Sequence, residues 1–594
     1  AATPWRFKFD LLRTTPIEDW PADALDYVRS DALLPRRIFE RQSEIAGGDW
    51  IVNERERTRA ALDLHVLAIP GWLTDRPRVQ RLLALYGKLI EQCTRYTITA
   101  GIVREKVIHA KKPDHPGHRT ERSVNTKHVQ ALVYQALGAE TPLAKAARGR
   151  GMSPDNCTPE QHLAHAARDR GAVGKAIVAR GGKPLDFVDA IAATEAGTLA
   201  QLLEASGDAE LNAYRAGEYA KKLVASFLLN YDTDKRVRTS YNELVATGRT
   251  SARGSKSAYA INVQNQPTDR DKPPEYQLRG CIVPGEDCVL VGSDYGQLEL
   301  CALGHLFSIV GRLHTGDPAY ESTLARAINE GEDCHAKVAS GLMGISYAEG
   351  LALKAAKDPH FDLMRKTAKP VNFGPPGGMG ARAFVDFALT SYGIVFTLAE
   401  SKAAIALWKA TWLEAPWYFA QINDACRAGG GLATIRQLYS GRVRGRCRYT
   451  AACNTLFQGL AADGALEALR LIIGACYREP AAFASMLGAY PPETKAACIA
   501  AAATLRAARF LPIAFVHDEF VGEQLDPLLF LRDQYATKAE RWALYHAAKQ
   551  RAKEGREDDL DALVIERAEE AMHALSTLMI SGMVQYIPDV AIRT

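Results

Sequence analysis

The sequence predicts an α+β protein in which helices predominate. Apolar residues recur every three or four positions over 22–42, over most of 50–230 and over 320–435, which indicates helices. Two short apolar runs, Cys288–Val291 and Ile513–Val516, lead into acidic residues and are typical of buried strands. With 47% apolar and 24% charged residues among 594, the chain is expected to fold throughout, in about four compact units.

The first helix is expected at Ala22–Gln42. It carries Tyr27 and Asp31, which lie four residues apart and therefore share one face of the helix. On spacing alone, a phenol and a carboxylate placed in this way are an ordinary surface pair.

A basic, His-rich stretch from Arg104 to Lys127 interrupts the helical pattern that follows. We expect a loop there. Two interpretations fit it: a loop that follows a phosphate backbone, and a solvated insertion. A later helical segment carries Glu218–Leu223.

Bulk composition narrows the class of protein. The net charge is +4, from 73 basic and 69 acidic residues, and this balance does not by itself indicate a nucleic-acid partner. Eleven cysteines without a Cys-x-x-Cys pair indicate reduced thiols and a cytoplasmic location rather than a zinc site or a disulfide framework.

No membrane segment is expected. The alanine-rich run Ala496–Leu505 is shorter than the roughly 20 residues that span a bilayer. The chain starts at Ala1 without Met or an apolar signal core, so we expect it to be trimmed or cut from a longer protein.

Two carboxylate clusters carry the main chemical signal. Asp294 follows one apolar strand, and Asp518 and Glu519 lie 224 and 225 residues later at the tip of an expected hairpin. Adjacent like charges are costly unless a cation neutralises them. Aspartates that share two divalent ions suit phosphoryl transfer.

A basic helical face lies between these clusters in the sequence. Arg365, Lys369 and Phe373 recur every four residues, which places them near one face of a helix. Arg and Lys can hold a triphosphate, and a Phe ring can pack on a base or a sugar.

In order and in chemistry, three segments resemble motifs A, B and C of the family A DNA polymerases: Ser293–Leu300, Arg365–Gly374 and Val516–Glu519. The resemblance is dense over about 215–525. It implies a right-hand fold with a thumb, a palm that contains an antiparallel sheet, and helical fingers, preceded by a remnant of a 3′–5′ exonuclease domain.

The resemblance also implies domain boundaries. We expect 1–48 to be the C-terminal part of the exonuclease domain, 49–235 the thumb and connecting helices, 236–315 the first part of the palm, 316–435 the fingers and 436–594 the second part of the palm.

Site residues follow from the resemblance as well. Asp294, Asp518 and Glu519 are the expected catalytic residues, and Asp294, Tyr295 and Asp518 the ligands of two Mg²⁺ ions, for which Mn²⁺ is expected to substitute. The expected nucleotide-binding residues are Glu299, His335, Arg365, Lys369 and Phe373, with Glu299 as the steric gate that excludes a 2′-hydroxyl. The expected DNA-binding residues are Arg249, Gln264, Asn265, Asn454, Gln458 and His517.

Tyr27 and Asp31 resemble the last motif of the proofreading exonucleases that precede many of these polymerases. Such an exonuclease also needs an Asp-x-Glu pair upstream, and the 26 residues before Tyr27 contain none. We therefore expect no self-sufficient proofreading by this chain.

The sequence departs from the family pattern in several places. Gly296 stands where Ser is usual and Cys301 where Arg is frequent, while the metal ligand remains unchanged. Gly377 occupies the position of a family Tyr and follows Pro375 and Pro376, so we expect the helix to break near Gly374. Pro370 is a second irregularity in the same helix.

The expected reaction is template-directed addition of deoxynucleoside triphosphates to a primer 3′ end. The variants at Asn372–Gly378 and Asn454–Gly459 look similar to those of phage polymerases, which implies a phage or viral source and the host cytoplasm. Primer-template DNA is the expected partner, together with a separate exonuclease chain or a processivity factor. Two rivals stay open: a single-subunit RNA polymerase and a catalytically silent primer-template binding protein.

Overall fold

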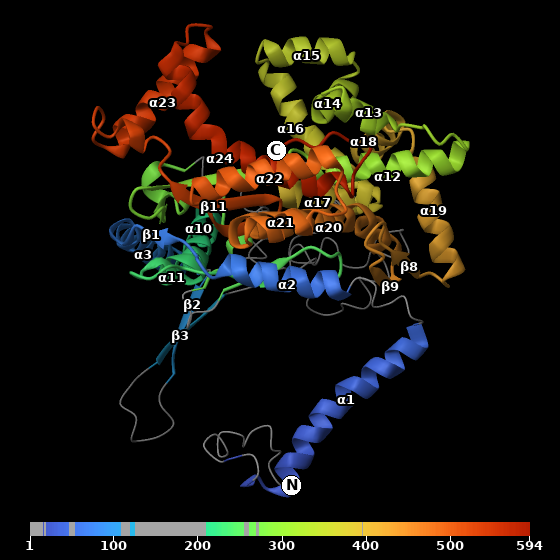
Figure 1. Ribbon diagram of the computed structural model, residues 1–594, viewed down its shortest axis with the longest axis horizontal. Helices are drawn as coiled ribbons and strands as arrows, with labels where there is room; N and C mark the ends of the chain where they lie inside the picture. Colours follow the sequence, from blue (N-terminus) through green and yellow to red (C-terminus); the bar gives the residue numbers. More distant parts are fainter. Residues whose placement is uncertain are drawn as a thin grey trace.

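The computed structural model shows a helix-rich body built around a small central sheet (Figure 1). It describes residues 16, 19–46, 54–101, 103–108, 119–124, 209–254, 260–268, 272–394 and 396–594. The first long helix, α1 (Ala22–Ala46), lies apart from this body at the bottom of the view.

The central sheet contains the two strands whose ends are acidic. Its strand order is β10-β11-β7, with β7 at Cys288–Asp294, β10 at Leu511–Val516 and β11 at Glu519–Leu525, and both pairings are antiparallel. The strands expected at Cys288–Val291 and Ile513–Val516 are therefore confirmed, and β7 extends through to Asp294.

A two-residue turn, His517 and Asp518, joins β10 to β11, since Val516 pairs with Glu519. His517 has φ of 61°, in the left-handed region that His, Asn and Asp enter more readily than most side chains. The rings of Phe515 and Phe520, which pair across the hairpin, stack at 4.5 Å between centroids. The predicted hairpin is confirmed, and it presents its acidic residues at one end.

Two hydrophobic cores hold this sheet. Phe515 and Phe520 belong to the larger core, and Ile513 and Ala514 belong to a smaller core that also contains Leu82 and Leu223. The larger core includes residues of α20 (Tyr449–Tyr477) and α24 (Asp559–Val584), which pack against each other. A sheet that is apolar on both faces has little freedom to shift its register.

The helices group around the sheet in space. Those between residues 316 and 435, the range expected to form the fingers, are α13 (Thr323–Asn329), α14 (Cys334–Met343), α15 (Tyr347–Ala355), α16 (Pro359–Phe373), α17 (Ala381–Tyr392), α18 (Leu398–Thr411) and α19 (Ala415–Ala428). Those that accompany the sheet, besides α20 and α24, are α12 (Leu298–Thr315), α21 (Pro480–Met486), α22 (Pro492–Ala507) and α23 (Lys538–Lys553). The helical pattern predicted for 320–435 is confirmed up to β8 (Ala433–Arg436), which pairs with β9 (Val443–Cys447).

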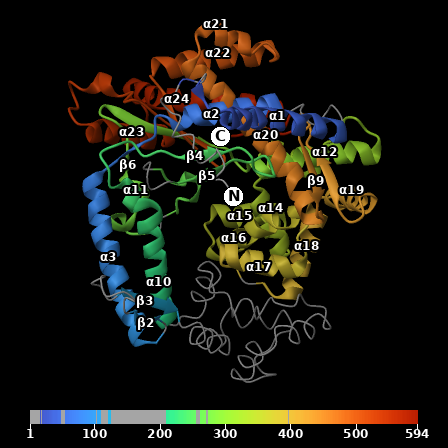
Figure 2. The ribbon, with the colours of Figure 1, turned by 90° about the horizontal axis from the view of Figure 1, so that it is seen from below.

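On the other side, α3 (Arg76–Thr99) and α10 (Ala209–Leu223) pack along each other. Seen from below, they run side by side at one edge of the molecule, and α14, α16, α17 and α18 lie on the opposite side (Figure 2). A π-helical turn at Val224–Leu228 and α11 (Leu229–Tyr231) continue α10 into the body. Shorter two-stranded pairings join β1 (Leu73–Thr74) to β6 (Ile282–Val283) and β4 (Ser240–Asn242) to β5 (Ser251–Arg253).

The basic stretch that we expected to be a loop contains a hairpin. Val103–Ile108 (β2) pairs with Arg119–Val124 (β3) along its whole length. The β-branched residues Val103, Val107 and Ile108 favour a strand, but the charged residues Arg104 to Lys106 between them concealed that preference. The expectation of a loop is wrong for these two segments, and the intervening residues and 125–208 lie outside the described residues.

The helix that follows α1 packs against the body rather than against α3. This helix, α2 (Glu54–Ala68), lies on α20 and β4. Its position places the start of the α3–α10 unit after residue 68, within the range 49–235 that we expected to contain the thumb and connecting helices.

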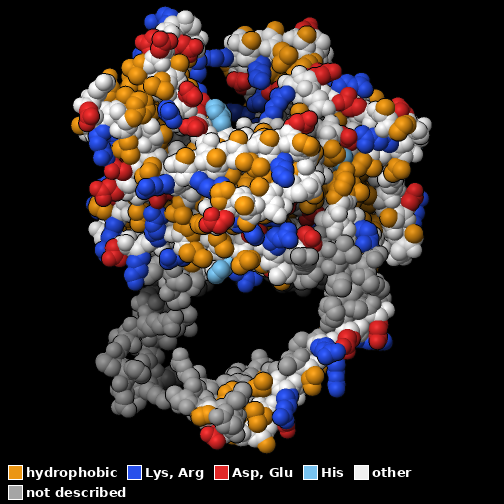
Figure 3. Space-filling model, viewed as in Figure 1, with side chains coloured by type: hydrophobic (Ala, Val, Ile, Leu, Met, Phe, Trp, Pro, Cys, Tyr) orange, Lys and Arg blue, Asp and Glu red, His pale blue; other side chains and the backbone are white. Residues whose placement is uncertain are grey.

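In the space-filling view, the surface is notched between the lobe of α23 and the lobe of α14–α16, and Lys and Arg side chains gather along the notch (Figure 3). Among the described helices, including the 29-residue α20, none is both long enough and apolar enough to cross a lipid bilayer. The alanine-rich run at 496–505 lies inside α22.

One prediction concerns the buried carboxylate of β11. Glu523 is 5% exposed and accepts hydrogen bonds from Arg236 at 2.9 Å and from the Gly285 amide at 2.8 Å. Arg236→Met should lower the free energy of unfolding by about 3 kcal/mol, because it leaves a buried charge without its cation. Urea unfolding followed by tryptophan fluorescence measures this change.

The matched control is Arg532→Met, which breaks the ion pair of Arg532 with Asp287, whose side chains are 52% and 43% exposed. This change should stay within about 0.5 kcal/mol. Equal losses in the two variants would contradict the assignment of Glu523 as a buried anchor of the sheet.

Candidate active site

The central sheet brings the two carboxylate clusters together. In the β7–β11 pairing, Asp294 lies opposite Glu519, so their side chains share one face of the sheet. The Tyr295 amide donates a hydrogen bond to the Asp518 carbonyl at 3.3 Å, which fixes the end of β7 against the turn. Residues 224 positions apart in the sequence therefore meet at one point.

Burial and mutual repulsion act on these aspartates. Burial first, and then the charge of Asp518, raise the pKa of Asp294 above its ordinary value. Burial also raises the pKa of Asp518, and the charge of Glu299 adds to it, while Arg249 and His517 oppose the rise. The site is therefore short of positive charge.

This shortage is what a cation site requires. Within the described part of the chain, neither Asp294 nor Asp518 forms a salt bridge with a basic side chain. No cluster of three or more His, Cys, Asp and Glu side chains arranged to hold a metal occurs among the described residues. Two carboxylates fit Mg²⁺, which usually takes one or two protein carboxylates and completes its shell with water and substrate phosphates.

Tyr295 could contribute only through its main chain. Its side chain is buried, and its hydroxyl donates to the Met579 carbonyl of α24 at 2.7 Å. The backbone carbonyl is therefore the oxygen that remains for the expected metal role.

The C-terminal part of the chain anchors the end of β7. The hydroxyl of Ser293 forms a hydrogen bond of 2.8 Å with the hydroxyl of Ser576 on α24, and the Gly296 amide donates to the Arg593 carbonyl at 2.8 Å. Gln297 then takes a left-handed conformation with φ of 56° and starts α12. These contacts set the direction in which Glu299, in the first turn of α12, leaves the backbone.

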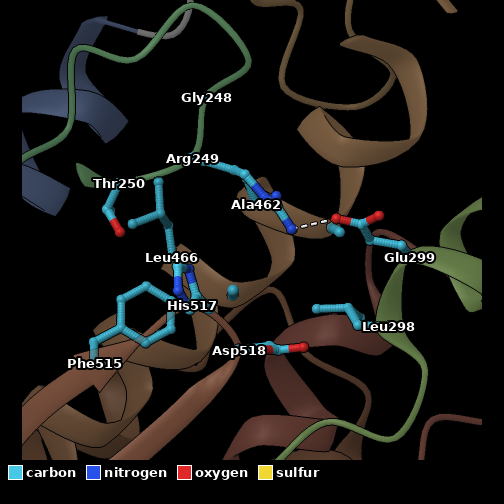
Figure 4. Close-up of a pocket in the computed structure, with 12 residues that line it drawn as sticks. Gly248, Arg249, Thr250, Leu298, Glu299, Ala462, Leu466, Phe515, His517 and Asp518 are labelled. Carbon is cyan, nitrogen blue, oxygen red and sulfur yellow. Dashed lines mark hydrogen bonds and ion pairs between the residues drawn. The ribbon is translucent and has the colours of Figure 1, made fainter. Parts of the chain in front are cut away.

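An ion pair spans a small pocket that Asp518 lines. Arg249 reaches from the loop before β5 and pairs with the carboxylate oxygen Oε1 of Glu299, while His517 and Asp518 lie on the opposite side of the pocket (Figure 4). The pair joins the residue expected to contact primer DNA to the residue expected to form the sugar gate.

Gly248 makes the position of this loop feasible. Its φ is 88°, and a Cβ there would lie 2.2 Å from the Arg442 guanidinium, so no other residue fits without movement. Arg442 is in turn held by Asp463 of α20 at 3.2 Å.

A cleft of about 940 Å³ lies between this point and α16, α17 and α20. It collects seven of the expected site residues: Glu299, His335, Lys369, Phe373, Asn454, Gln458 and Asp518. Glu299 and Asp518 also line the smaller pocket that contains Arg249 and His517. The two spaces therefore meet at the acidic residues.

The helix α16 presents the expected basic face to the cleft only in part. Lys369 and Phe373 line the cleft, and Lys369 has no ion-pair partner among the described residues. Arg365 instead donates from Nε to Asp333 at 2.8 Å, and Lys354 binds the same carboxylate oxygen.

Asp333 is a functional neighbour that sequence reasoning missed. It caps α14 by accepting from the His335 and Ala336 amides at 3.0 Å. Hydrogen bonds from Lys354 and Arg365 hold the pKa of its carboxyl well below the usual range, against the effect of burial. An Asp just before a helix is a recognisable capping signal, although its basic partners are not readable from the sequence.

His335 lies against α16 with its ring 5.5 Å from that of Phe373. The Asn372 amide donates to His335 Nδ1 at 2.9 Å, which leaves the proton on Nε2. Burial lowers the pKa of His335 to about 4, and the charges of Arg365 and Lys369 add to this effect while Asp333 opposes it. The ring is therefore a neutral donor at the wall of the cleft.

Two further residues expected to contact DNA, Gln264 and Asn265, lie beside the turn that contains His517. His517 donates from Nε2 to the Gln264 carbonyl at 2.9 Å, and the Gln264 side chain donates to Thr250 at 2.9 Å. Asn265 lies next to Gln264 in a short 3-10 helix, Val263–Asn265.

Comparisons with known proteins decide the family. A sequence model of DNA polymerase family A matches residues 185–486, which is half of the chain. The chain belongs to DNA polymerase family A.

Individual relatives match shorter segments. The chain is 37% identical to a thermostable DNA polymerase I of Thermus thermophilus over 147 residues, which is 25% of this chain and 14% of that protein. It is 29% identical to DNA polymerase I of Lactococcus lactis subsp. lactis (strain IL1403) over 240 residues, which is 39% of this chain and 23% of that protein. The matched segments thus span less than a quarter of these curated relatives.

A solved structure also matches the chain. It is the POL domain of Pol1 from M. smegmatis in complex with DNA primer-template and dNTP, with 19% identity and a TM-score of 0.44. The match covers 86% of this chain and 70% of that one.

This family A chain breaks its motif B helix where the sequence predicted. Helix α16 ends at Phe373, a 3-10 turn follows at Pro375–Gly377, and α17 begins at Ala381. Pro370 lies inside α16 and is buried, and its ring nitrogen has no N–H to give to the preceding turn.

The cleft side chains that sequence reasoning missed include Met379, Phe387, Tyr392 and Arg444. Phe387 and Tyr392 come from α17, which begins after the break. Spacing shows that aromatic residues cluster in α17, but it does not show that they face Glu299.

The expected exonuclease residues lie far from this site. Tyr27 is half-buried on α1, which is drawn apart from the body in Figure 1. Asp31 lies on the same helix, and its side chain falls outside the described residues.

The low pKa of His335 gives a pH prediction. Between about 4 and the ordinary value of 6.5, the unfolded chain binds a proton that the folded chain excludes, so the free energy of unfolding rises with pH across this window. A pKa of 6.5 in the unfolded chain and of about 4 in the folded chain changes the free energy of unfolding by about 3 kcal/mol across this window. His335→Gln should lose this increment and show a flatter stability curve from pH 4 to 6.5 in urea unfolding.

His573→Gln serves as the control, because its side chain is 68% exposed on α24, and it should keep the slope of the wild type. The same slope in His335→Gln as in the wild type would contradict the burial of a neutral ring at this position.

Proposed function

We propose that this chain is a DNA-directed DNA polymerase that adds deoxynucleotides to the 3′ end of a primer paired with a template. The observation that carries the proposal is that Asp518, next to Asp294 at the end of the sheet, lines the same cleft as Lys369 and Phe373. Acidic and basic groups in one cleft suit a metal-bound triphosphate lying between them.

Asp294 and Asp518 would hold the Mg²⁺ ions, with Mn²⁺ as a substitute, and the Tyr295 carbonyl would assist. Bound there, the metal supplies charge that neutralises the triphosphate and favours ionisation of the primer hydroxyl. Glu519 lies opposite Asp294 in the sheet and supports the site from that side.

The walls of the cleft would position the nucleotide. Lys369 binds the triphosphate as a point charge, and the Nε2 donor of His335 binds a phosphate oxygen nearby. Arg365 adds positive charge from behind Asp333. Phe373 packs on the base or the sugar of the incoming nucleotide.

Glu299 would act as the sugar gate. It lies at the start of α12, and it lines both the cleft and the smaller pocket that contains Arg249 and His517, which we call the primer-side pocket. A carboxylate at that point excludes a 2′-hydroxyl by occupying its space, so the chain should prefer deoxynucleotides.

The DNA contacts would follow the loop side and α20. Arg249 and His517 meet the primer end, Gln264 and Asn265 follow the template, and Asn454 and Gln458 read the minor groove of the new pair. Minor-groove acceptors occupy similar places in every base pair, so such contacts test the shape of a pair without reading its sequence.

We propose the right-hand division of the chain on the same basis. The α3–α10 unit is the thumb, α13–α19 are the fingers, and the central sheet with α20 and α24 is the palm. Helix α1, with Tyr27 and Asp31, would belong to an exonuclease domain. The proposal also includes a phage source, with a separate exonuclease chain or a processivity factor as partner.

Asp294→Ala tests the catalytic assignment. Extension of a labelled primer on a defined template with Mg²⁺ should fall by about 10³-fold or more, since the cation loses a ligand at the reacting centre. Fluorescence anisotropy should show DNA affinity within a few fold of the wild type at one stated salt concentration. Full extension by Asp294→Ala would sink the assignment.

The choice of sugar is tested separately with the wild type. Deoxynucleotides should support extension, ribonucleotides should not, and EDTA should stop the reaction. Extension with ribonucleotides would favour the RNA polymerase alternative, and DNA binding without extension by either set would favour a silent binding protein.

A further inference from the structure

The wall of the cleft after α16 is built by side chains from other helices. A Cβ at Gly374 would lie 2.9 Å from the Phe384 ring and 3.1 Å from the Phe387 ring, and a Cβ at Gly377 would lie 2.7 Å from the Asn454 amide. The space beside these glycines is therefore already filled from α17 and α20.

Helix α17 supplies an aromatic row to this wall. The rings of Phe384 and Phe387 lie 6.5 Å apart, and those of Phe387 and Tyr392 lie 5.6 Å apart in an edge-to-face arrangement. Phe387 and Tyr392 line the cleft together with Phe373 of α16. Tyr392 is thus held at the cleft by its neighbour rather than by its own hydroxyl.

That hydroxyl is available. Tyr392 is 37% exposed, and in the described part of the chain its hydroxyl has no hydrogen-bond partner. Burial of the ring and then the charge of Glu299 raise the pKa of Tyr392, so the phenol stays protonated and can donate.

Glu299 has the matching acceptor. Arg249 occupies only its Oε1, and within the described residues Oε2 has no partner. Arg249 lines the primer-side pocket and Tyr392 lines the nucleotide cleft, while Glu299 lines both. An ionised carboxylate accepts several hydrogen bonds, so one donor does not exclude the other.

We propose that Tyr392 is a positioning residue for nucleotide selection: its hydroxyl donates to Glu299 when a nucleotide fills the cleft and fixes that carboxylate against the sugar. The inference rests on the proposed function. The gate would then include the last residue of α17, the helix that begins after the break at Pro375–Gly377.

Tyr392→Phe is the test, because it removes the hydroxyl and keeps the ring that packs on Phe387. Single-nucleotide incorporation gives kcat/KM for dATP and for ATP, and their ratio measures discrimination. Tyr392→Phe should lower this ratio about three- to tenfold, the worth of one hydrogen bond. Tyr477→Phe, at a tyrosine 48% exposed at the end of α20, should leave the ratio unchanged.

A double-mutant cycle shows whether the effect passes through Glu299. In the Glu299→Ala background, Tyr392→Phe should change the ratio no further. An unchanged ratio in Tyr392→Phe would overturn the inference, and so would an equal change of the ratio with and without Glu299. In either case, extension by the wild type would leave the proposed function intact. No extension by the wild type with either nucleotide would overturn both together.

Discussion

The antiparallel pairing of β7 with β11 is the constraint on which the rest of the site depends. It places Asp294 opposite Glu519, and the bond from the Tyr295 amide to the Asp518 carbonyl fixes the turn beside it. A slip of one residue would turn every side chain of the strand to the other face. Apolar cores on both faces of the sheet, and α24 against the end of β7, resist that slip.

The charges of the site are left without opposite partners. Asp294 is exposed and Asp518 is partly exposed, and neither forms a salt bridge within the described residues, while Lys369 lines the same cleft as Asp518 without an acidic partner. Glu299 and Arg249 instead satisfy each other across the primer-side pocket. A metal-bound triphosphate would provide the missing opposite charges, because the metal would face the aspartates and the triphosphate would face Lys369. This would explain why the protein does not pair the aspartates with Lys369.

The sequence predicts two features of this site that the structure contains. An apolar strand leads into Asp294 and another into the turn that holds Asp518, so their proximity could be predicted. The helix break after Phe373 could be predicted because consecutive prolines cannot continue a helix. The partner of Arg365 was not identifiable, since Asp333 caps another helix 32 residues earlier. The role of α17 was also hidden, because periodicity shows which face of a helix is apolar but not which cleft that face meets.

The central claim is that Asp294 and Asp518 act as one metal site created by the β7–β11 pairing. Electron paramagnetic resonance of Mn²⁺ bound to the chain with a dideoxy-terminated primer-template and the next dNTP tests it directly. We expect two ions with coupled spins, about 4 Å apart as in two-metal sites, and loss of the coupling in Asp518→Asn. Mn²⁺ that binds only to the nucleotide, with the same spectrum in Asp518→Asn as in the wild type, would contradict it.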